Sequence, residues 1–175
     1  AYDIGFGGID HVIASGADVN MLVMDNEVYA NTGGQVSKGT PRSAIEKFSA
    51  AGKAAAKKDL GFMAMTYGNV YVAQIASGAN KMQTIKAFEE AERHNGPSII
   101  IAYTPCISHG LRGGMSQTIR EAKEAVESGY WQLYRYNPNL DDIGKHPLTL
   151  DFKNPDFEKM TESMTHHVRF ASLQV

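Results

Sequence analysis

The chain has 175 residues, with 17 lysines and arginines against 19 acids, a formal net charge of -2 and 43% hydrophobic residues. This length suits one globular domain with a real core, and the small net charge excludes a broad electrostatic attraction to nucleic acid or to anionic membranes. The longest apolar stretch, residues 99–103, is far shorter than the roughly 20 residues that span a bilayer. We therefore expect neither nucleic acid nor membrane as a partner.

The cysteine count and the N-terminal residues bear on compartment and completeness. A single cysteine excludes an internal disulfide, and the first residues contain neither a basic leader nor the apolar core of a secretion signal. A cytoplasmic location is therefore expected. The chain begins at Ala1, directly before a helical pattern, which predicts a fragment of a longer polypeptide whose preceding strand is absent.

Helical and extended patterns alternate along the chain. Apolar residues at helical spacing predict a first helix that ends near residues 15–16. Apolar runs predict strands at residues 19–24, 69–75, 98–103 and 130–136, and further helices are expected at 43–57, 82–94 and 117–128. This order predicts an α/β fold with an open, mostly parallel sheet and crossover helices on both faces. The nearly continuous apolar character of residues 19–24 also predicts a strand covered on both faces.

The pattern changes after residue 136, where three prolines interrupt it: Pro138, Pro147 and Pro155. We predict a main domain of residues 1–136 and a C-terminal arm of residues 137–175 with a short helix. Asn154 is expected to cap that helix, with Pro155 as its first residue. Four apolar residues would then share one face: Phe157, Met160, Met164 and Val168. Such a face serves either as ordinary core or as an intersubunit contact.

The loop that follows the first strand reads DNEVYANTGGQ, residues 25–35. Ligands of open parallel sheets bind at the carboxyl ends of the strands, and the double glycine at 33–34 lets backbone amides approach an anion. The side-chain oxygen of Asn26 and the carbonyl of Val28 are suitable ligands for a magnesium ion shared with a diphosphate. The alternative is that asparagine and glycine simply form a turn here.

Cys106 follows the strand at residues 98–103, so it leaves the predicted sheet at the same edge as Asn26. A lone cysteine is most often a small buried hydrophobic residue, but this position favours a functional role. His109 and Arg112 share the loop, and we interpret them as loop-ordering or surface groups rather than as an acid–base pair.

Two other groups of residues have more than one interpretation. Three lysines could meet a phosphate-bearing substrate or form a solvated helix face: Lys53, Lys57 and Lys58. His166 and His167 lie on the predicted tail helix without cysteine or acidic neighbours at ligand spacing in the sequence. We interpret this histidine pair as structural.

Other distinctive blocks accompany residues 25–35: AYDIGFGGIDHV, KFSAAGKAAAKKDL, MTYGNVYVAQIASGANKMQTIKAFEEAE, GPSIIIAYTPCISHGLRGGM and SGYWQLYRYNP. Together these blocks closely resemble the C-terminal thiamine diphosphate-binding domain of pyruvate:ferredoxin (flavodoxin) oxidoreductases. The resemblance covers nearly the whole chain, and it implies the thiamin diphosphate-binding fold.

The resemblance also implies roles for particular residues. Asn26 would bind magnesium through its side chain and Val28 through its carbonyl, while Asn31 would reach the thiazolium and the 2-oxo acid as the catalytic residue. Three further residues would line the diphosphate: Glu27, Tyr29 and Ala30. Cys106 would be the fourth thiolate of a 4Fe-4S cluster, whose other three ligands lie outside this chain. The Gly-Asp-Gly start of the family's motif is absent from this sequence.

The implied activity is the oxidative decarboxylation of pyruvate to acetyl-CoA and carbon dioxide, with electrons passing through iron-sulfur clusters to ferredoxin or flavodoxin. The implied partners are pyruvate, coenzyme A, the electron acceptor, the remaining domains of the same polypeptide and a second copy in a homodimer. Two alternatives stay open: the same chemistry on another 2-oxo acid, and a non-catalytic cofactor-binding or assembly module. The isolated chain is expected to be inactive.

Overall fold

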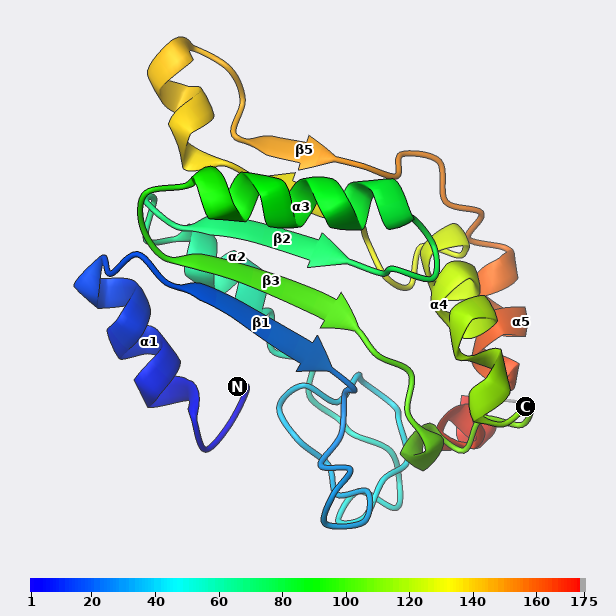
Figure 1. The fold of residues 1–175 in the computed structure, drawn as a ribbon. Coiled ribbons are helices and arrows are strands. Elements are labelled where there is room, and N and C mark those ends of the chain that lie inside the picture. Colours follow the sequence, from blue (N-terminus) through cyan, green and yellow to red (C-terminus); the bar gives the residue numbers. More distant parts are fainter. Residues whose placement is uncertain (174–175) are drawn as a thin grey trace.

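A computed structural model describes residues 1–173 and shows an α/β fold built on a five-stranded sheet (Figure 1). The helices are α1 (Phe6–Ser15), α2 (Leu60–Met65), α3 (Lys81–Arg93), α4 (Thr118–Glu127) and α5 (Lys159–Thr165). The strands are β1 (Asn20–Asp25), β2 (Tyr71–Ile75), β3 (Ser98–Tyr103), β4 (Tyr134–Tyr136) and β5 (Leu148–Leu150). Short 3-10 segments are η1 (Ile107–His109), η2 (Met115–Gln117), η3 (Pro138–Ile143) and η4 (Val168–Leu173).

The strand order is β1-β3-β2-β4-β5. β1 and β2 each pair with β3 in parallel, whereas β4 is antiparallel to β2 and β5 is antiparallel to β4. The predicted fold class is confirmed, and the sheet is mixed rather than uniformly parallel. α3 crosses back along the whole sheet, but α4 stays beside the carboxyl ends of the parallel strands (Figure 1). β4 therefore enters from that end and runs in the opposite direction.

Alternating side chains of the central strands build a separate core on each face of the sheet, as the period of two in a strand requires. The face under α3 contains these buried residues: Tyr71, Ala73, Ile75 and Ile100, with Ala87 and Ala91 of α3. The opposite face contains, among others, Val72, Ile99 and Ile101, with Ile13 of α1, Leu60 of α2 and Ala122 of α4. Helices therefore cover both faces, as the sequence predicts.

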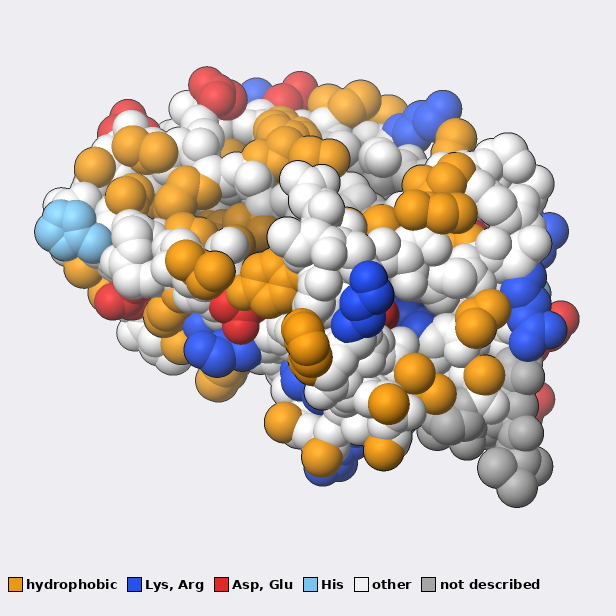
Figure 2. Space-filling model, turned by 90° about the horizontal axis from the view of Figure 1, so that it is seen from below, with side chains coloured by type: hydrophobic (Ala, Val, Ile, Leu, Met, Phe, Trp, Pro, Cys, Tyr) orange, Lys and Arg blue, Asp and Glu red, His pale blue; other side chains and the backbone are white. Residues whose placement is uncertain are grey.

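β1 lies at the edge of the sheet, and the expectation that it is covered on both faces is wrong. Val23 points into the core, but Leu22 is 53% exposed and Met24 is 68% exposed. The cause is the position of α3, which packs on β2 and β3. Figure 2, the view from below, shows hydrophobic side chains gathered on the side where α1 and β1 lie.

Residues 43–57 do not form the predicted helix. Three of them have left-handed backbone angles: Ser43, Phe48 and Gly52. Ile45 instead donates its N–H to the carbonyl of Arg169 at 2.7 Å, and Lys47 donates its N–H to the carbonyl of Gly34 at 2.9 Å. These long-range hydrogen bonds override the helix propensity of an alanine-rich segment, which is a weak preference of tenths of a kcal/mol per residue.

Other element boundaries differ by a few residues or were not predicted. α2 begins after Asp59, whose side chain accepts the N–H of Phe62 at 2.8 Å and so caps a helix that the sequence did not reveal. β4 is shorter than the predicted strand, and β5 was not predicted. α5 begins at Lys159 after Glu158, so the predicted start near Asn154 is wrong.

The tail after residue 136 folds back on the rest of the described chain. β5 extends the sheet, and the guanidinium of Arg135 binds both carboxylate oxygens of Asp151, at 2.9 and 2.8 Å. α5 packs on α4. None of the helices in residues 1–173 combines the length and the apolar character that crossing a membrane requires.

Candidate cofactor and cluster site

The loops that follow β1 and β3 leave the sheet side by side. Asp25 is level with Tyr103 in the parallel register, and the carbonyl of Asp25 accepts the N–H of Thr104 at 3.0 Å. Farther out, a Cβ built on Gly34 would lie 3.8 Å from the Cβ of Ser108. The structure therefore brings the loop of residues 26–35 and the loop of residues 104–110 together, as their shared position at the carboxyl edge predicts.

The first turn of the loop after β1 is shaped by its own side chains. The carboxylate of Asp25 accepts the N–H of Glu27 at 2.9 Å, and the amide oxygen of Asn26 accepts the N–H of Val28 at 3.4 Å. Glu27 has a φ of 59°, which is uncommon outside glycine. Two successive turns of the type that Asp and Asn form with the backbone therefore reverse the chain here.

A cavity of about 210 Å³ lies between this turn and the first residues of the chain, and its lining includes Tyr2, Asn26 and Val28. Among the described residues, no hydrogen bond reaches the carbonyl of Val28, and the amide oxygen of Asn26 accepts one long bond. Both residues line the same cavity, and each has a neutral oxygen with an unused lone pair. They fit the oxygen ligation that magnesium requires.

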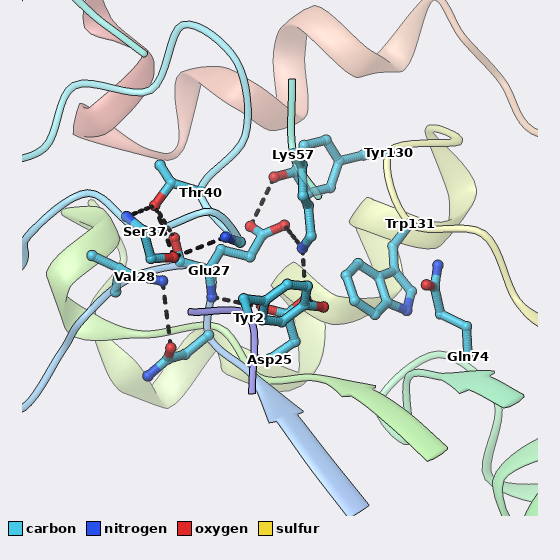
Figure 3. A network of polar contacts seen from close by, with 12 residues as sticks. Tyr2, Asp25, Glu27, Val28, Ser37, Thr40, Lys57, Gln74, Tyr130 and Trp131 are labelled. Carbon is cyan, nitrogen blue, oxygen red and sulfur yellow. Dashed lines mark hydrogen bonds and ion pairs between the residues drawn. The ribbon is translucent and has the colours of Figure 1, made fainter. Parts of the chain in front are cut away.

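Glu27 is the centre of a buried network of charges (Figure 3). Its side chain is 1% exposed, and its two oxygens lie 2.7 Å from the ammonium of Lys57 and 2.7 Å from the guanidinium of Arg169. The hydroxyl of Tyr130 donates to Glu27 at 2.8 Å, and Lys57 also contacts the carboxylate of Asp25 at 2.6 Å. Two acids thus face two cations, so the group is neutral as a whole.

The charge states of this network follow from its geometry. Burial alone would raise the pKa of Glu27, but Lys57 and Arg169 outweigh it and hold that pKa well below the usual range. Burial likewise acts to lower the pKa of Lys57, and Glu27 and Asp25 reverse the shift and raise it. The carboxylate of Glu27 is fully engaged in ion pairs, its N–H donates to Asp25, and its carbonyl accepts the hydroxyl of Thr40 at 2.7 Å, so Glu27 shapes the turn through bonds that are already made.

The interpretation of the lysines as a solvated helix face is wrong. Lys57 is held in the network around Glu27. Lys53 donates to the carbonyls of Lys38, Thr40 and Ala56 at 2.6 to 3.2 Å and so fastens its own irregular segment. These lysines close the loops around the candidate site.

Cys106 is half-buried and stands directly before η1. Its sulfur accepts the backbone N–H of Ser108 at 3.4 Å. A backbone N–H directed at sulfur is the kind of contact that tunes a thiolate ligand of an iron-sulfur cluster. The local geometry of Cys106 therefore fits a metal-bound thiolate as well as a thiol.

His109 joins the two loops. Its side chain is completely buried, its Nε2 lies 2.5 Å from the carbonyl oxygen of Asn26, and its Nδ1 faces the N–H of Cys106 at 3.5 Å. Burial and the nearby guanidinium of Arg169 lower the pKa of His109 to about 3. The ring is therefore neutral at physiological pH, with the proton on Nε2 because a carbonyl can only accept. These contacts support the interpretation of His109 as a loop-ordering residue.

The histidine pair of the tail has acidic neighbours that the sequence did not reveal. The Nδ1 of His166 lies 3.0 Å from a carboxylate oxygen of Glu124, and the Nε2 of His167 lies 3.3 Å from one of Glu121. Both acids belong to α4, so spacing within the tail could not reveal them. The pair holds the tail against α4. The side chains of Glu121, Glu124 and His166 also bring one ligand atom each within 4.8 Å of one another, so the structural interpretation of the pair stays a prediction.

Asn31 lies apart from the groups described above. It is exposed near the tip of the loop, where the N–H of Gly33 donates to the carbonyl of Ala30 at 3.0 Å. Tyr29 pairs with Gln35 at the base of the same tip. The structure thus gathers Asn26, Val28 and the loop of Cys106, while residues 31–33 are exposed.

Gly110 ends η1 in the left-handed region with a φ of 67°, and a Cβ there would lie 2.6 Å from the Cβ of Val168. We expect Gly110→Ala to lower the free energy of unfolding by about 2–4 kcal/mol, from backbone strain and a clash with the tail. Gly144→Ala is the matched control, because Gly144 has a φ of 69° and open space around it. Urea denaturation should show a loss of about 1–2 kcal/mol for the control. Equal losses for the two variants would contradict the proposed clash.

A comparison with known protein families shows the family to which the chain belongs. The model of the thiamine pyrophosphate enzyme C-terminal TPP binding domain matches residues 1–102. The chain belongs to this family, and the resemblance inferred from its sequence blocks is confirmed.

Individual relatives show which members of this family the chain resembles. The chain is 60% identical over 173 residues to the pyruvate-flavodoxin oxidoreductase of Klebsiella pneumoniae and 57% identical over 174 residues to the pyruvate:ferredoxin oxidoreductase of Moorella thermoacetica. Each match covers 99% of this chain but 15% of the relative, so the chain spans about a seventh of their length. A solved 2-oxoglutarate:ferredoxin oxidoreductase from Magnetococcus marinus matches with a TM-score of 0.58 and 19% identity, over 99% of this chain and 62% of that one. This last likeness shows the fold.

Proposed function

We propose that this chain is the thiamine diphosphate-binding part of a larger enzyme that oxidatively decarboxylates pyruvate to acetyl-CoA and carbon dioxide and passes the electrons to ferredoxin or flavodoxin. The observation that carries the proposal is the pair of neutral oxygens at Asn26 and Val28, the first with one long hydrogen bond and the second with none among the described residues, in two residues that line a cavity at the carboxyl edge of the sheet. The identity of the chain to two pyruvate oxidoreductases supports the same choice of substrate.

The residues of the loop after β1 suit distinct tasks in this function. Asn26 and Val28 would hold a magnesium ion that binds the diphosphate, and the backbone at Glu27, Tyr29 and Ala30 would border the phosphates. Thiamine diphosphate, when bound, supplies the carbanion chemistry that cleaves the 2-oxo acid. Asn31, exposed at the loop's tip, is free to contact the thiazolium and the substrate.

Cys106 is proposed to complete a 4Fe-4S cluster with three thiolates from outside this chain. The side-by-side exit of the loops after β1 and β3 supports this role, because it brings the loop of Cys106 beside the loop of Asn26. A short path suits electrons that leave the substrate. The remaining domains of the polypeptide, coenzyme A and a second copy in a homodimer are the further proposed partners.

A second candidate is the same chemistry on another 2-oxo acid. The solved relative with 2-oxoglutarate and coenzyme A bound shares the fold of this chain, and a fold alone does not choose a substrate. An assay of the full-length enzyme with pyruvate, 2-oxoglutarate and branched 2-oxo acids tests the choice. Pyruvate is expected to give the highest kcat/KM, and a lower value than for another acid would reject pyruvate as the substrate.

Replacing Asn26 by alanine in the full-length enzyme is expected to raise the magnesium concentration needed for half-maximal thiamine diphosphate binding by about 10- to 100-fold. We base this range on the cost of losing even an indirect partner at a metal site. Asn26→Asp keeps an oxygen ligand and should lose less. Asn95→Ala is the control, because Asn95 is exposed at the opposite end of β3.

The measurement is cofactor binding by isothermal titration over a series of magnesium concentrations, together with pyruvate-dependent dye reduction. Wild-type magnesium dependence in Asn26→Ala would remove Asn26 from the metal site. We expect the isolated 175-residue chain to show no turnover, because the other cluster thiolates and much of the substrate site belong to the rest of the polypeptide.

A further inference from the structure

We propose that His109 is a positioning residue that fixes the metal-binding turn and the cysteine loop relative to each other. The inference deepens the proposed function, since it assigns a cause to the close approach of the cofactor loop and the cluster ligand. It concerns contacts of His109 with the backbone of Asn26 and Cys106, two residues to which separate roles are assigned above.

The geometry joins the two loops through one imidazole ring. The Nε2–H donates to the carbonyl of Asn26, and the opposite ring nitrogen, Nδ1, faces the N–H of Cys106. The width of a rigid ring therefore sets the separation of the two backbone segments. A flexible side chain would leave that separation adjustable.

The bond to Asn26 also determines which oxygens of the turn face the cavity. The carbonyl of Asn26 is directed at His109, and the next residue, Glu27, has left-handed backbone angles. The side-chain oxygen of Asn26 and the carbonyl of Val28 are left for a cation. Without the imidazole, the peptide group between Asn26 and Glu27 would lose the partner that holds its orientation.

The ring of His109 is itself locked in place. It stacks on the ring of His167 with centroids 5.6 Å apart and planes 22° apart, and the carbonyl of the adjacent Gly110 accepts the N–H of Val168 at 3.0 Å. The side chain of His109 is fully buried, so water does not replace its hydrogen bond. The tail therefore supports His109, which in turn supports the metal-binding turn.

His94 provides a matched comparison within the same chain. It is 5% exposed, and its Nε2 bonds the carbonyl of Asn69 at 3.0 Å. It lies at the end of α3, at the amino edge of the sheet, and contacts neither of the two loops. Loss of His94 should therefore reproduce the general cost of losing a buried histidine without the specific effect on the site.

The experiment uses the full-length enzyme with four variants: His109→Leu, His109→Gln, His109→Asn and His94→Leu. The readouts are the magnesium concentration at half-maximal thiamine diphosphate binding and the rate of cluster reduction in stopped flow after pyruvate addition. We expect His109→Leu to need at least about tenfold more magnesium and to reduce the cluster at least about tenfold more slowly. His109→Gln retains a donor of similar reach, so both measured quantities should stay within about threefold of the wild-type values. His94→Leu should also stay within about threefold of the wild type.

Two outcomes with the leucine variants would overturn the proposal. One is a His109→Leu enzyme with wild-type magnesium dependence and wild-type cluster reduction. The other is a His94→Leu enzyme that needs as much extra magnesium and reduces the cluster as slowly as His109→Leu. If His109→Leu does not fold, His109→Gln and His109→Asn decide, because the shorter amide of asparagine cannot span the same gap. Equal behaviour of these two variants would also reject the proposal.

A second readout separates this proposal from the proposed function. Hydrogen–deuterium exchange of the full-length protein without cofactor follows peptides that cover residues 25–35 and 104–110. Faster exchange in both peptides for His109→Leu, with no change for His94→Leu, supports the positioning role even if the wild type binds no thiamine diphosphate. Unchanged exchange in both peptides rejects the role even if the enzyme is fully active.

Discussion

Replacing Glu27 by glutamine is expected to lower the free energy of unfolding of the chain by about 3–5 kcal/mol, the usual cost of breaking a buried ion pair by removing one partner. The substitution keeps the shape of the side chain but removes the charge that compensates Lys57 and Arg169. Arg169, whose side chain is 1% exposed, would then remain buried without a carboxylate partner. Lys57 would keep its contact with Asp25.

Urea denaturation of the 175-residue chain, followed by circular dichroism, measures this effect. Glu89→Gln is the control, because Glu89 forms an exposed pair with Arg93 at 3.8 Å. Exposed pairs of this kind contribute about 0–1 kcal/mol, so the control should change little. If Glu27→Gln were no more destabilising than the control, the buried network would not anchor the loop after β1.

Replacing Cys106 by alanine is expected to abolish pyruvate-dependent electron flow in the full-length enzyme. A 4Fe-4S cluster needs four protein ligands, and the proposed function assigns one of them to this residue. The cluster nearest the cofactor should then be missing from the electron paramagnetic resonance spectrum, with a matching loss of iron and sulfide. Thiamine diphosphate binding should survive, because Asn26 and Val28 are unchanged.

Ser108→Ala serves as the matched control for the cysteine variant. It leaves the backbone N–H that reaches the sulfur of Cys106 in place, so the cluster and the electron flow should be retained. A Cys106→Ala enzyme with its full iron content and normal electron transfer would show that the thiol is an ordinary core residue. The cluster would then have all its ligands elsewhere in the polypeptide.

The central fold could be predicted because its elements have strong local patterns. After Ser98, β3 is an apolar run that ends before Thr104, and α3 begins after a capping residue, Asn80, and is stopped by the glycine and proline at residues 96–97. The prediction of a helix at residues 43–57 is wrong because the conformation of this segment depends on partners far away in the sequence, such as Arg169. The sequence did not predict β5 for a similar reason. This strand is three residues long, and only its pairing with β4 makes it a strand.

The candidate site was predictable in part. Asn26 and Cys106 each follow the end of a parallel strand, and that position alone is enough to place both residues at one edge of the sheet. The network around Glu27 was not predictable, because Lys57, Tyr130 and Arg169 lie 30 to 142 residues away from it in the sequence. The role of His109 required the same long-range information, since its partner Asn26 is 83 residues distant.

The uncovered flank of β1 affects how the chain behaves on its own. One side of this strand pairs with β3, and along the other side alternate residues of the strand direct their N–H and C=O groups outward without a partner strand in residues 1–173. The strand contains neither lysine nor proline, two residues that commonly discourage unwanted pairing at such a border. The isolated chain therefore has an unpaired edge strand that favours self-association. An additional strand paired with β1 would satisfy these peptide groups.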